Sequence, residues 1–146
     1  MYQMIQTKIS TVKEAQDISI NKPEAILEQC KDMTELAQES FQILTVNAKG
    51  KLIDRHLISL GIVNASIVHP REVLRACILD SASAYIAVHN HPSGDTTPSA
   101  EDIIITRQLI EASKILDIKM LDHVIVGRYQ ATPRFLSMKK ENICQF

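Results

Sequence analysis

The chain has 146 residues, of which 45% are hydrophobic and 23% are charged, a balance typical of one ordinary globular domain. Its 16 basic and 17 acidic side chains leave a net charge of −1, which gives no electrostatic reason to expect tight binding to nucleic acid. The basic residues near the C-terminus are most simply a solvated polar edge; they are Arg128, Arg134, Lys139 and Lys140.

The first half of the chain predicts an irregular start, a helix and a β-hairpin. Residues 1–22 are expected to form an irregular lead-in, and Pro23 suits the first position of a helix that runs to about residue 30. A second short helical stretch is expected at 33–37. Two apolar runs follow at 41–46 and 52–60, and the glycine-bearing turn between them predicts an antiparallel hairpin.

The second half of the chain predicts strands and helices in alternation. The continuous apolar run at 84–88 is typical of a central strand buried on both faces, and it leads directly into His89. The helix that begins at Pro70 is expected to bury Val73, Leu74, Cys77 and Ile78. The expected elements are strands at 65–68, 84–88, 120–126 and 135–138, and helices from 70 and at 99–116. This order predicts an α/β fold, with a mixed β-sheet packed between helices, formed by residues 23–146 as one domain.

Two histidines and an acid follow the predicted central strand. The chain reads His-Asn-His-Pro-Ser-Gly-Asp-Thr-Thr-Pro-Ser-Ala-Glu-Asp from His89 to Asp102. Because residues two apart on a strand point the same way, the imidazoles of His89 and His91 can face one point. Two imidazoles and a carboxylate suit zinc, which in catalytic sites keeps one position open for a water that it makes acidic. The spacing therefore favours a zinc hydrolase over a pair of structural histidines.

Ser99 and Asp102 have a structural alternative. Ser-x-x-Asp after a proline is close to a capping box with Ser99 as the N-cap, and capping needs no metal. However, Asp102 also lies on the predicted inward stripe of the helix, and an inward carboxylate needs a strong partner. That stripe continues through Ile105, Leu109, Ala112 and Leu116. Both roles stay open at this point.

Hydrolysis also needs a group that moves protons, and spacing alone does not identify it. The candidate acids are Glu35, Glu39, Glu72 and Glu101. Glu39 has a modest advantage because it opens a predicted strand and shares a face with Phe41 and Ile43. An exposed surface acid is the alternative for each of the four.

Several linked motifs resemble those of one family. His89-x-His91-Pro followed by Ser99-x-x-Asp102 resembles the motif of the JAMM (MPN+) metalloproteases, and the longer string His-Asn-His-Pro-Ser-Gly-Asp resembles their bacterial RadC branch. Supporting matches are Pro-Arg-Glu-Val from Pro70 and Leu-Asp-His-Val-Ile-Val from Leu121. Full-length RadC relatives carry a helix-hairpin-helix region before the catalytic domain, and residues 1–38 are too short for one. The chain therefore looks like a short form.

The resemblance implies an MPN/JAMM-like fold, layered like that of the cytidine deaminases, and one zinc ion per chain on His89, His91 and Asp102. It implies Glu39 as the general acid/base, because the family places this acid two residues before a phenylalanine at a strand start. It implies that Ser99 donates a hydrogen bond to the oxyanion of the tetrahedral intermediate. The implied activity is hydrolysis of peptide or isopeptide bonds in a substrate that the sequence does not specify.

Other functions remain as alternatives. One is a DNA-repair-associated or DNA-binding accessory protein without hydrolytic turnover, because the RadC family has long carried that label, although the neutral charge argues against it. Another is a binding module that has lost activity. A zinc deaminase is excluded, because its His-x-Glu and Pro-Cys-x-x-Cys ligands are absent. For Asp122-His123, a role beside the site and a locally bonded pair are both open. A homodimer is also compatible, since related domains often pair.

The cysteines and the hydrophobic pattern bear on the compartment. Cys30, Cys77 and Cys144 form no C-x-x-C pair, and scattered thiols fit a reducing cytosol. The N-terminal segment shows no apolar core of a signal peptide, and no apolar run approaches the roughly 20 residues that span a bilayer. We therefore expect a cytoplasmic protein without membrane contact.

Overall fold

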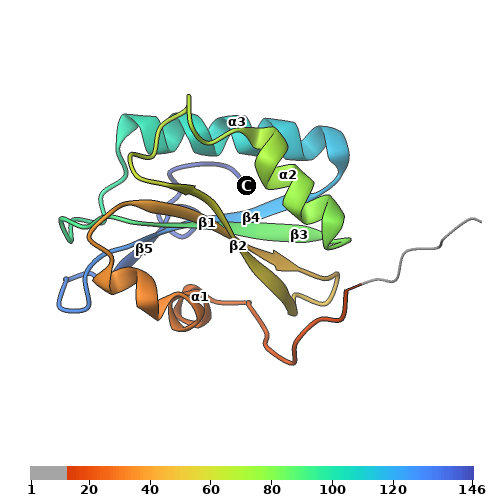
Figure 1. The fold of residues 1–146 in the computed structure, drawn as a ribbon, viewed down its shortest axis with the longest axis horizontal. Helices are drawn as coiled ribbons and strands as arrows, with labels where there is room; N and C mark the ends of the chain where they lie inside the picture. Colours follow the sequence, from red (N-terminus) through yellow and green to blue (C-terminus); the bar gives the residue numbers. More distant parts are fainter. Residues whose placement is uncertain (1–12) are drawn as a thin grey trace, which may run out of the picture.

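The computed structural model describes residues 13–146 and shows a five-stranded sheet with helices on both faces (Figure 1). The elements in chain order are α1 (Pro23–Gln29), the 3₁₀ helix η1 (Lys31–Glu35), β1 (Ser40–Val46), β2 (Leu52–Leu60), α2 (Pro70–Leu79), β3 (Ala84–Asn90), α3 (Ala100–Leu116), β4 (Lys119–Val126) and β5 (Phe135–Ser137). The predicted α/β fold with a mixed sheet between helices is confirmed.

The sheet has the strand order β2-β1-β3-β4-β5. Only β3 and β4 run parallel, because α3 connects them as a crossover, while the other three strand pairs are antiparallel. β3 lies at the centre and all of its residues are buried, which explains its continuous apolar run. In the antiparallel register of β1 and β3, Phe41 lies opposite His89, so the start of β1 meets the end of β3.

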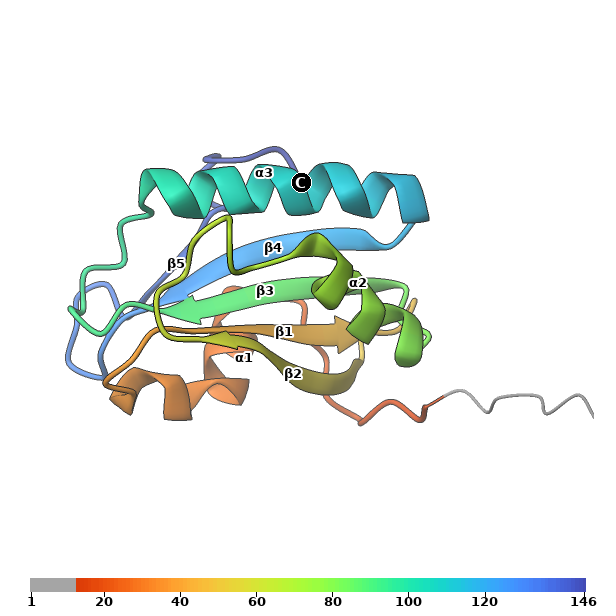
Figure 2. The ribbon, with the colours of Figure 1, turned by 45° about the horizontal axis from the view of Figure 1, so that its top comes forward.

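Two hydrophobic clusters hold the layers together. α2 and α3 cover one face of the sheet and α1 covers the other (Figure 2). Phe41, Tyr85 and Leu109 are fully buried in the first cluster, and burying a side chain of this size stabilises the fold by about 1.5–3 kcal/mol. The second cluster packs Ile26 of α1 and Met33 of η1 against the opposite face. His89, near the end of β3, therefore sits on an element packed from both faces.

Most predicted elements are found, but the strand expected at 65–68 is wrong. That segment is a turn, because Asn64 accepts hydrogen bonds from the residues that follow it. Its carbonyl binds the amide groups of Ile67 and Val68, and its side chain binds the amide of Ser66. This local bonding replaces the ladder that a strand would need. Ile78, expected to be buried in α2, is 58% exposed.

The lead-in predicted for residues 1–22 is described from Lys13 onward, and its first twelve residues lie outside the described part. From Gln16 to Ile20 it runs beside the start of β2, where Ser19 forms a β-bridge with Lys51 and Ile20 is buried. Within residues 13–146, no helix combines the length and the hydrophobicity that crossing a membrane would require.

Candidate metal centre

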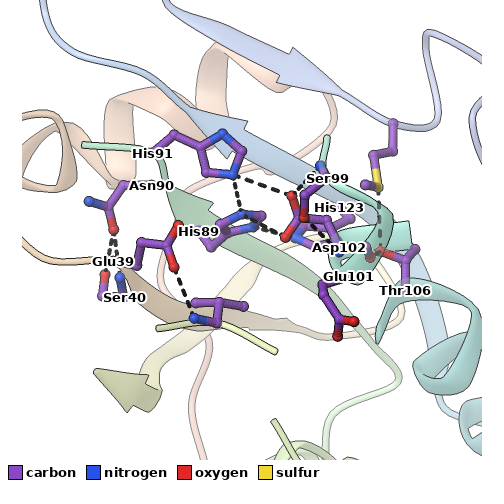
Figure 3. A network of polar contacts seen from close by, with 12 residues as sticks. Glu39, Ser40, His89, Asn90, His91, Ser99, Glu101, Asp102, Thr106 and His123 are labelled. Carbon is purple, nitrogen blue, oxygen red and sulfur yellow. Dashed lines mark hydrogen bonds and ion pairs between the residues drawn. The ribbon is translucent and has the colours of Figure 1, made fainter. Parts of the chain in front are cut away.

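The two histidines and the acid singled out from the sequence converge where β3 ends and α3 begins (Figure 3). The Nε2 atoms of His89 and His91 are 2.8 Å apart. Each lies 3.3 Å from a carboxylate oxygen of Asp102. His89 is completely buried and Asp102 is 2% exposed, so solvent reaches very little of these two side chains. Such a junction between a strand end and a helix start is a common location for sites in α/β folds.

The three converging atoms can hold a metal ion. With zinc bonds of about 2.0–2.1 Å, ligand atoms at the corners of a tetrahedron lie roughly 3.3 Å apart. Each imidazole Nε2 lies at this spacing from an oxygen of Asp102, His89 from Oδ1 and His91 from Oδ2, and the two histidine nitrogens would have to separate by a few tenths of an ångström. His91 points its other ring nitrogen, Nδ1, at the carbonyl oxygen of Asp95, 2.6 Å away. A carbonyl only accepts, so Nδ1 carries the proton and Nε2 of His91 is free for a ligand bond.

Electrostatics keep Asp102 in the charged form that a ligand needs. Burial pushes the pKa of this carboxyl upward, but the adjacent rings of His89 and His91 and a hydrogen bond from the Ser99 amide outweigh it and hold the pKa well below its usual range. For His91, burial lowers the pKa, but the adjacent Asp102 carboxylate and the Asp95 carbonyl prevail and the net shift of the pKa is upward. The acid and the imidazoles thus share a strongly polarised site.

The capping box at the start of α3 is present. The Ser99 hydroxyl accepts a hydrogen bond from the Asp102 amide at 3.1 Å, and the Asp102 carboxylate accepts one from the Ser99 amide at 2.7 Å. The structural alternative for this pair is therefore correct, and Asp102 faces the histidines as well. The Ser99 hydroxyl oxygen acts as an acceptor here, so its own hydrogen remains to be donated. Its catalytic role stays a prediction.

Glu39 lies beside the same site, just before β1. Its Oε2 atom accepts a hydrogen bond from the Val63 amide at 2.9 Å. Glu39 and Ser99 line one open groove of about 670 Å³, together with Glu101 and the segment 62–66. Glu101 binds the Ala65 amide at the far side of this groove, so position alone does not separate the two acids. Glu39 also acts electrostatically on His91, and its role as a proton carrier stays a prediction.

Asn90 is a residue that the sequence argument missed. It lies between the two histidines but points to the opposite face of the sheet. Its amide nitrogen donates to the carbonyl of Gln38 at 2.9 Å, and its oxygen accepts from the amide of Ser40 at 2.7 Å. These two contacts bracket Glu39, so the buried Asn90 fixes the backbone from which Glu39 extends (Figure 3).

The structure separates the two residues of the Asp122-His123 pair. Asp122 is bonded locally, because its carboxylate accepts from the Ser137 hydroxyl and the Lys139 amide. His123 is fully buried and contacts the site: its Nε2 lies 2.8 Å from Nδ1 of His89, and its Nδ1 lies 2.6 Å from the hydroxyl oxygen of Thr106. Burial holds the pKa of His123 well below its usual value. Thr106 is four residues after Asp102 on α3, a spacing that could have drawn attention to it.

A family model described as a RadC-like JAB domain matches residues 20–143. The chain belongs to the RadC family. The RadC resemblance drawn from the histidine and serine motifs is therefore confirmed, over a longer stretch than those motifs cover.

Relatives of this RadC domain carry uninformative names. The chain is 45% identical over 134 residues to a UPF0758 protein of Caldanaerobacter subterraneus, covering 91% of this chain and 56% of the relative. A UPF0758 protein of Listeria monocytogenes is 42% identical, with coverages of 92% and 58%, and one of a Geobacillus species is 48% identical, with coverages of 75% and 47%. The RadC chain thus spans about half the length of the curated relatives it matches.

Proposed function

We propose that this RadC-like JAB domain is a zinc-dependent hydrolase of peptide or isopeptide bonds. The observation that carries the proposal is the convergence of two imidazole nitrogens and one ionised carboxylate, from His89, His91 and Asp102. Ser99, which is bonded to Asp102, and Glu39 line the neighbouring groove. A set of two nitrogens and one oxygen suits zinc better than magnesium or calcium, which prefer oxygen ligands. Bound zinc would supply a Lewis acid that makes a water reactive near neutral pH.

The chain's own residues would do the rest of the chemistry. Glu39 would accept the proton of the attacking water and return it to the leaving amine, a contribution of about 10²–10⁴-fold to the rate. The Val63 amide holds Oε2 of Glu39, which leaves Oε1 for that proton. The Ser99 hydroxyl would donate to the oxyanion, and such a donor contributes about 10²–10³-fold.

Metal content tests the ligand part of this proposal. We expect elemental mass spectrometry to find about one zinc per chain in the purified wild-type protein and almost none in His89→Ala. Folded wild-type protein that takes up no zinc when it is supplied would contradict the proposal.

Hydrolysis tests the role of Glu39. Internally quenched peptides and lysine-linked isopeptides serve as probes. Glu39→Gln should retain zinc and lose at least about 10²-fold in rate, because the amide cannot accept the proton. The matched control is Glu35→Gln, which changes an exposed acid of η1 and should leave the rate unchanged. Full activity in Glu39→Gln would exclude this role.

A further inference from the structure

A series of short polar contacts connects two of the three candidate ligands, His89 and Asp102, by way of strand β4. It begins at Nδ1 of His89 on β3, passes through both ring nitrogens of His123 on β4, and reaches the hydroxyl of Thr106 on α3. The Thr106 hydroxyl then lies 2.6 Å from the backbone carbonyl of Asp102. His89, His123, Thr106 and the Asp102 carbonyl are all buried, so these groups bond to one another rather than to water (Figure 3).

The last contact fixes the direction of every hydrogen in the series. The carbonyl of Asp102 can only accept, so the Thr106 hydroxyl must donate to it. That hydroxyl has one hydrogen, so its oxygen accepts from Nδ1–H of His123. In a neutral His123 this leaves Nε2 bare, and it must accept from Nδ1–H of His89.

We propose that His123 and Thr106 are positioning residues that hold His89 as its Nδ1–H tautomer, so that Nε2 of His89 presents a free lone pair to a metal ion. This inference rests on the metal site put forward under the proposed function. It assigns His123 no contact with substrate or with the reacting atoms. Metal-bound histidines usually donate their second nitrogen to a carboxylate, a carbonyl or water. Here a neutral imidazole takes that place, and it is itself oriented by the backbone of another ligand residue.

The opposite direction would block the site. If Thr106 donated to His123, His123 would donate from Nε2 to His89, and the proton of His89 would sit on Nε2. That hydrogen would point at His91 and Asp102, where a metal ion has to bind. It would also leave two oxygen atoms, the Thr106 hydroxyl and the Asp102 carbonyl, facing each other at 2.6 Å without a hydrogen between them. The proposed direction leaves a different pair without a hydrogen, the Nε2 atoms of His89 and His91 at 2.8 Å, and a bound metal ion would fill that place.

Nuclear magnetic resonance can identify the tautomers directly. Metal-free protein with ¹⁵N-labelled histidine, at pH 8, gives long-range ¹H–¹⁵N correlations whose pattern distinguishes Nδ1–H from Nε2–H rings. We expect the Nδ1–H form for both His89 and His123. A His89 ring protonated on Nε2 would overturn the proposal, whether or not the protein hydrolyses any substrate.

Zinc affinity tests the same inference by mutation. Thr106→Val keeps the shape of the side chain but removes the hydroxyl, and its zinc dissociation constant, measured by competition with a chelator, should rise about 10–100-fold. Thr106→Ser restores the hydroxyl and should bind zinc within about threefold of the wild type. Wild-type zinc affinity in Thr106→Val would refute the assignment.

Ser113→Ala is the control for a purely structural effect. Ser113 is buried on the same helix, and its hydroxyl forms a hydrogen bond with the Tyr85 hydroxyl. The substitution removes this bond, which lies outside the metal site. Its thermal stability without metal should fall, yet its zinc affinity should stay that of the wild type. Equal losses of zinc affinity in Ser113→Ala and Thr106→Val would show that general destabilisation is the cause and would overturn the positioning role. Absence of zinc binding in the wild type contradicts the proposed function instead, and the tautomer of His89 still decides this inference.

Discussion

Asn90 is the clearest case in which one side chain holds another residue in place. Its amide pairs with the carbonyl of Gln38 and the amide of Ser40, and so it spans Glu39. In Asn90→Ala the Ser40 amide loses its acceptor in a buried position, which costs about 1–3 kcal/mol. We expect a lower midpoint of urea unfolding, while the slope of the unfolding free energy against urea concentration stays unchanged.

The same variant separates the position of Glu39 from the ligand set. His89 and His91 point to the other face of the sheet, so Asn90→Ala should still bind about one zinc per chain. Loss of zinc together with stability would show that Asn90 supports the metal site itself rather than the backbone around Glu39. Zinc content measured on the folded fraction makes this distinction.

At the scale of elements, the loop between β3 and α3 depends on the residue that follows β4. A Cβ atom on Gly127 would lie 2.9 Å from the carbonyl oxygen of Gly94, which is backbone and cannot rotate away. Gly94 itself has a φ of +89°, in the region that favours glycine. The loop is also tied to β4 by a hydrogen bond from the His91 amide to the Val126 carbonyl.

Gly127→Ala should therefore displace the loop that carries His91. Overpacking of this kind costs about 1–3 kcal/mol. If the loop has to return to its original position when zinc binds, this energy is subtracted from the binding free energy, and each 1.4 kcal/mol lowers the affinity about tenfold. We expect zinc affinity to fall by about tenfold or more in a chelator competition. Gly50→Ala is the control: its Cβ would meet open space, but its φ of +72° costs about 1–2 kcal/mol of backbone strain. Equal zinc affinities in the two variants would contradict the prediction.

The sequence predicted those features that depend on neighbours along the chain. The hairpin, the buried strand at 84–88 and the capped helix after Ser99 follow from periodicity and local capping, and all three are present. The strand expected at 65–68 failed because one residue, Asn64, bonds the following amides through its side chain and its backbone carbonyl. Periodicity carries no information on such a bond.

In the candidate site, too, the features set by local spacing could be predicted and the contacts between distant residues could not. His89 and His91 are two residues apart where β3 ends, so their convergence could be predicted, and the Ser-x-x-Asp spacing brought Asp102 to the start of a helix. The contacts of Asn90 with Ser40 and of His123 with His89 span 50 and 34 residues. They depend on the register between strands, which the sequence alone does not give.

For the whole molecule, a second polar cluster joins the lead-in to the sheet and to α2. Asp80, at the end of α2, accepts hydrogen bonds from Thr45 of β1 and His56 of β2, and Lys13 of the lead-in pairs with both Asp80 and Asp54. Asp54, His56 and Asp80 also have metal-ligand geometry, but the Lys13 ammonium and the Thr45 hydroxyl already satisfy the two acids. We therefore interpret this cluster as a structural network.

This network predicts an acid-sensitive part of the stability. Burial raises the pKa of Asp80, but the hydrogen bonds from Thr45, His56 and Lys13 outweigh it, and the net pKa lies below the ordinary 3.8. A carboxyl whose pKa is lowered by folding stabilises the protein above its unfolded pKa and loses that contribution as the pH falls through the folded pKa. Asp80→Asn should therefore cost about 1–3 kcal/mol at pH 7, and the difference from the wild type should shrink below about pH 4. Urea unfolding at pH 7, 5 and 3 measures it, and a difference that stays constant down to pH 3 would exclude the assignment.

Metal binding should couple the site to the stability of the whole domain, because its ligands come from β3, the following loop and α3. A ligand that binds only the folded state adds about 2.7 kcal/mol at a free concentration of 100 times its dissociation constant. Zinc should therefore raise the melting temperature of the wild type. Asp102→Asn separates the two roles of this residue, since its amide oxygen can still accept the Ser99 amide in the capping box while the negative charge is lost. We expect this variant to fold without metal but to lose most of the zinc-dependent increase in melting temperature. If it keeps the full increase, Asp102 is a helix cap only, and a different acid must complete the metal site.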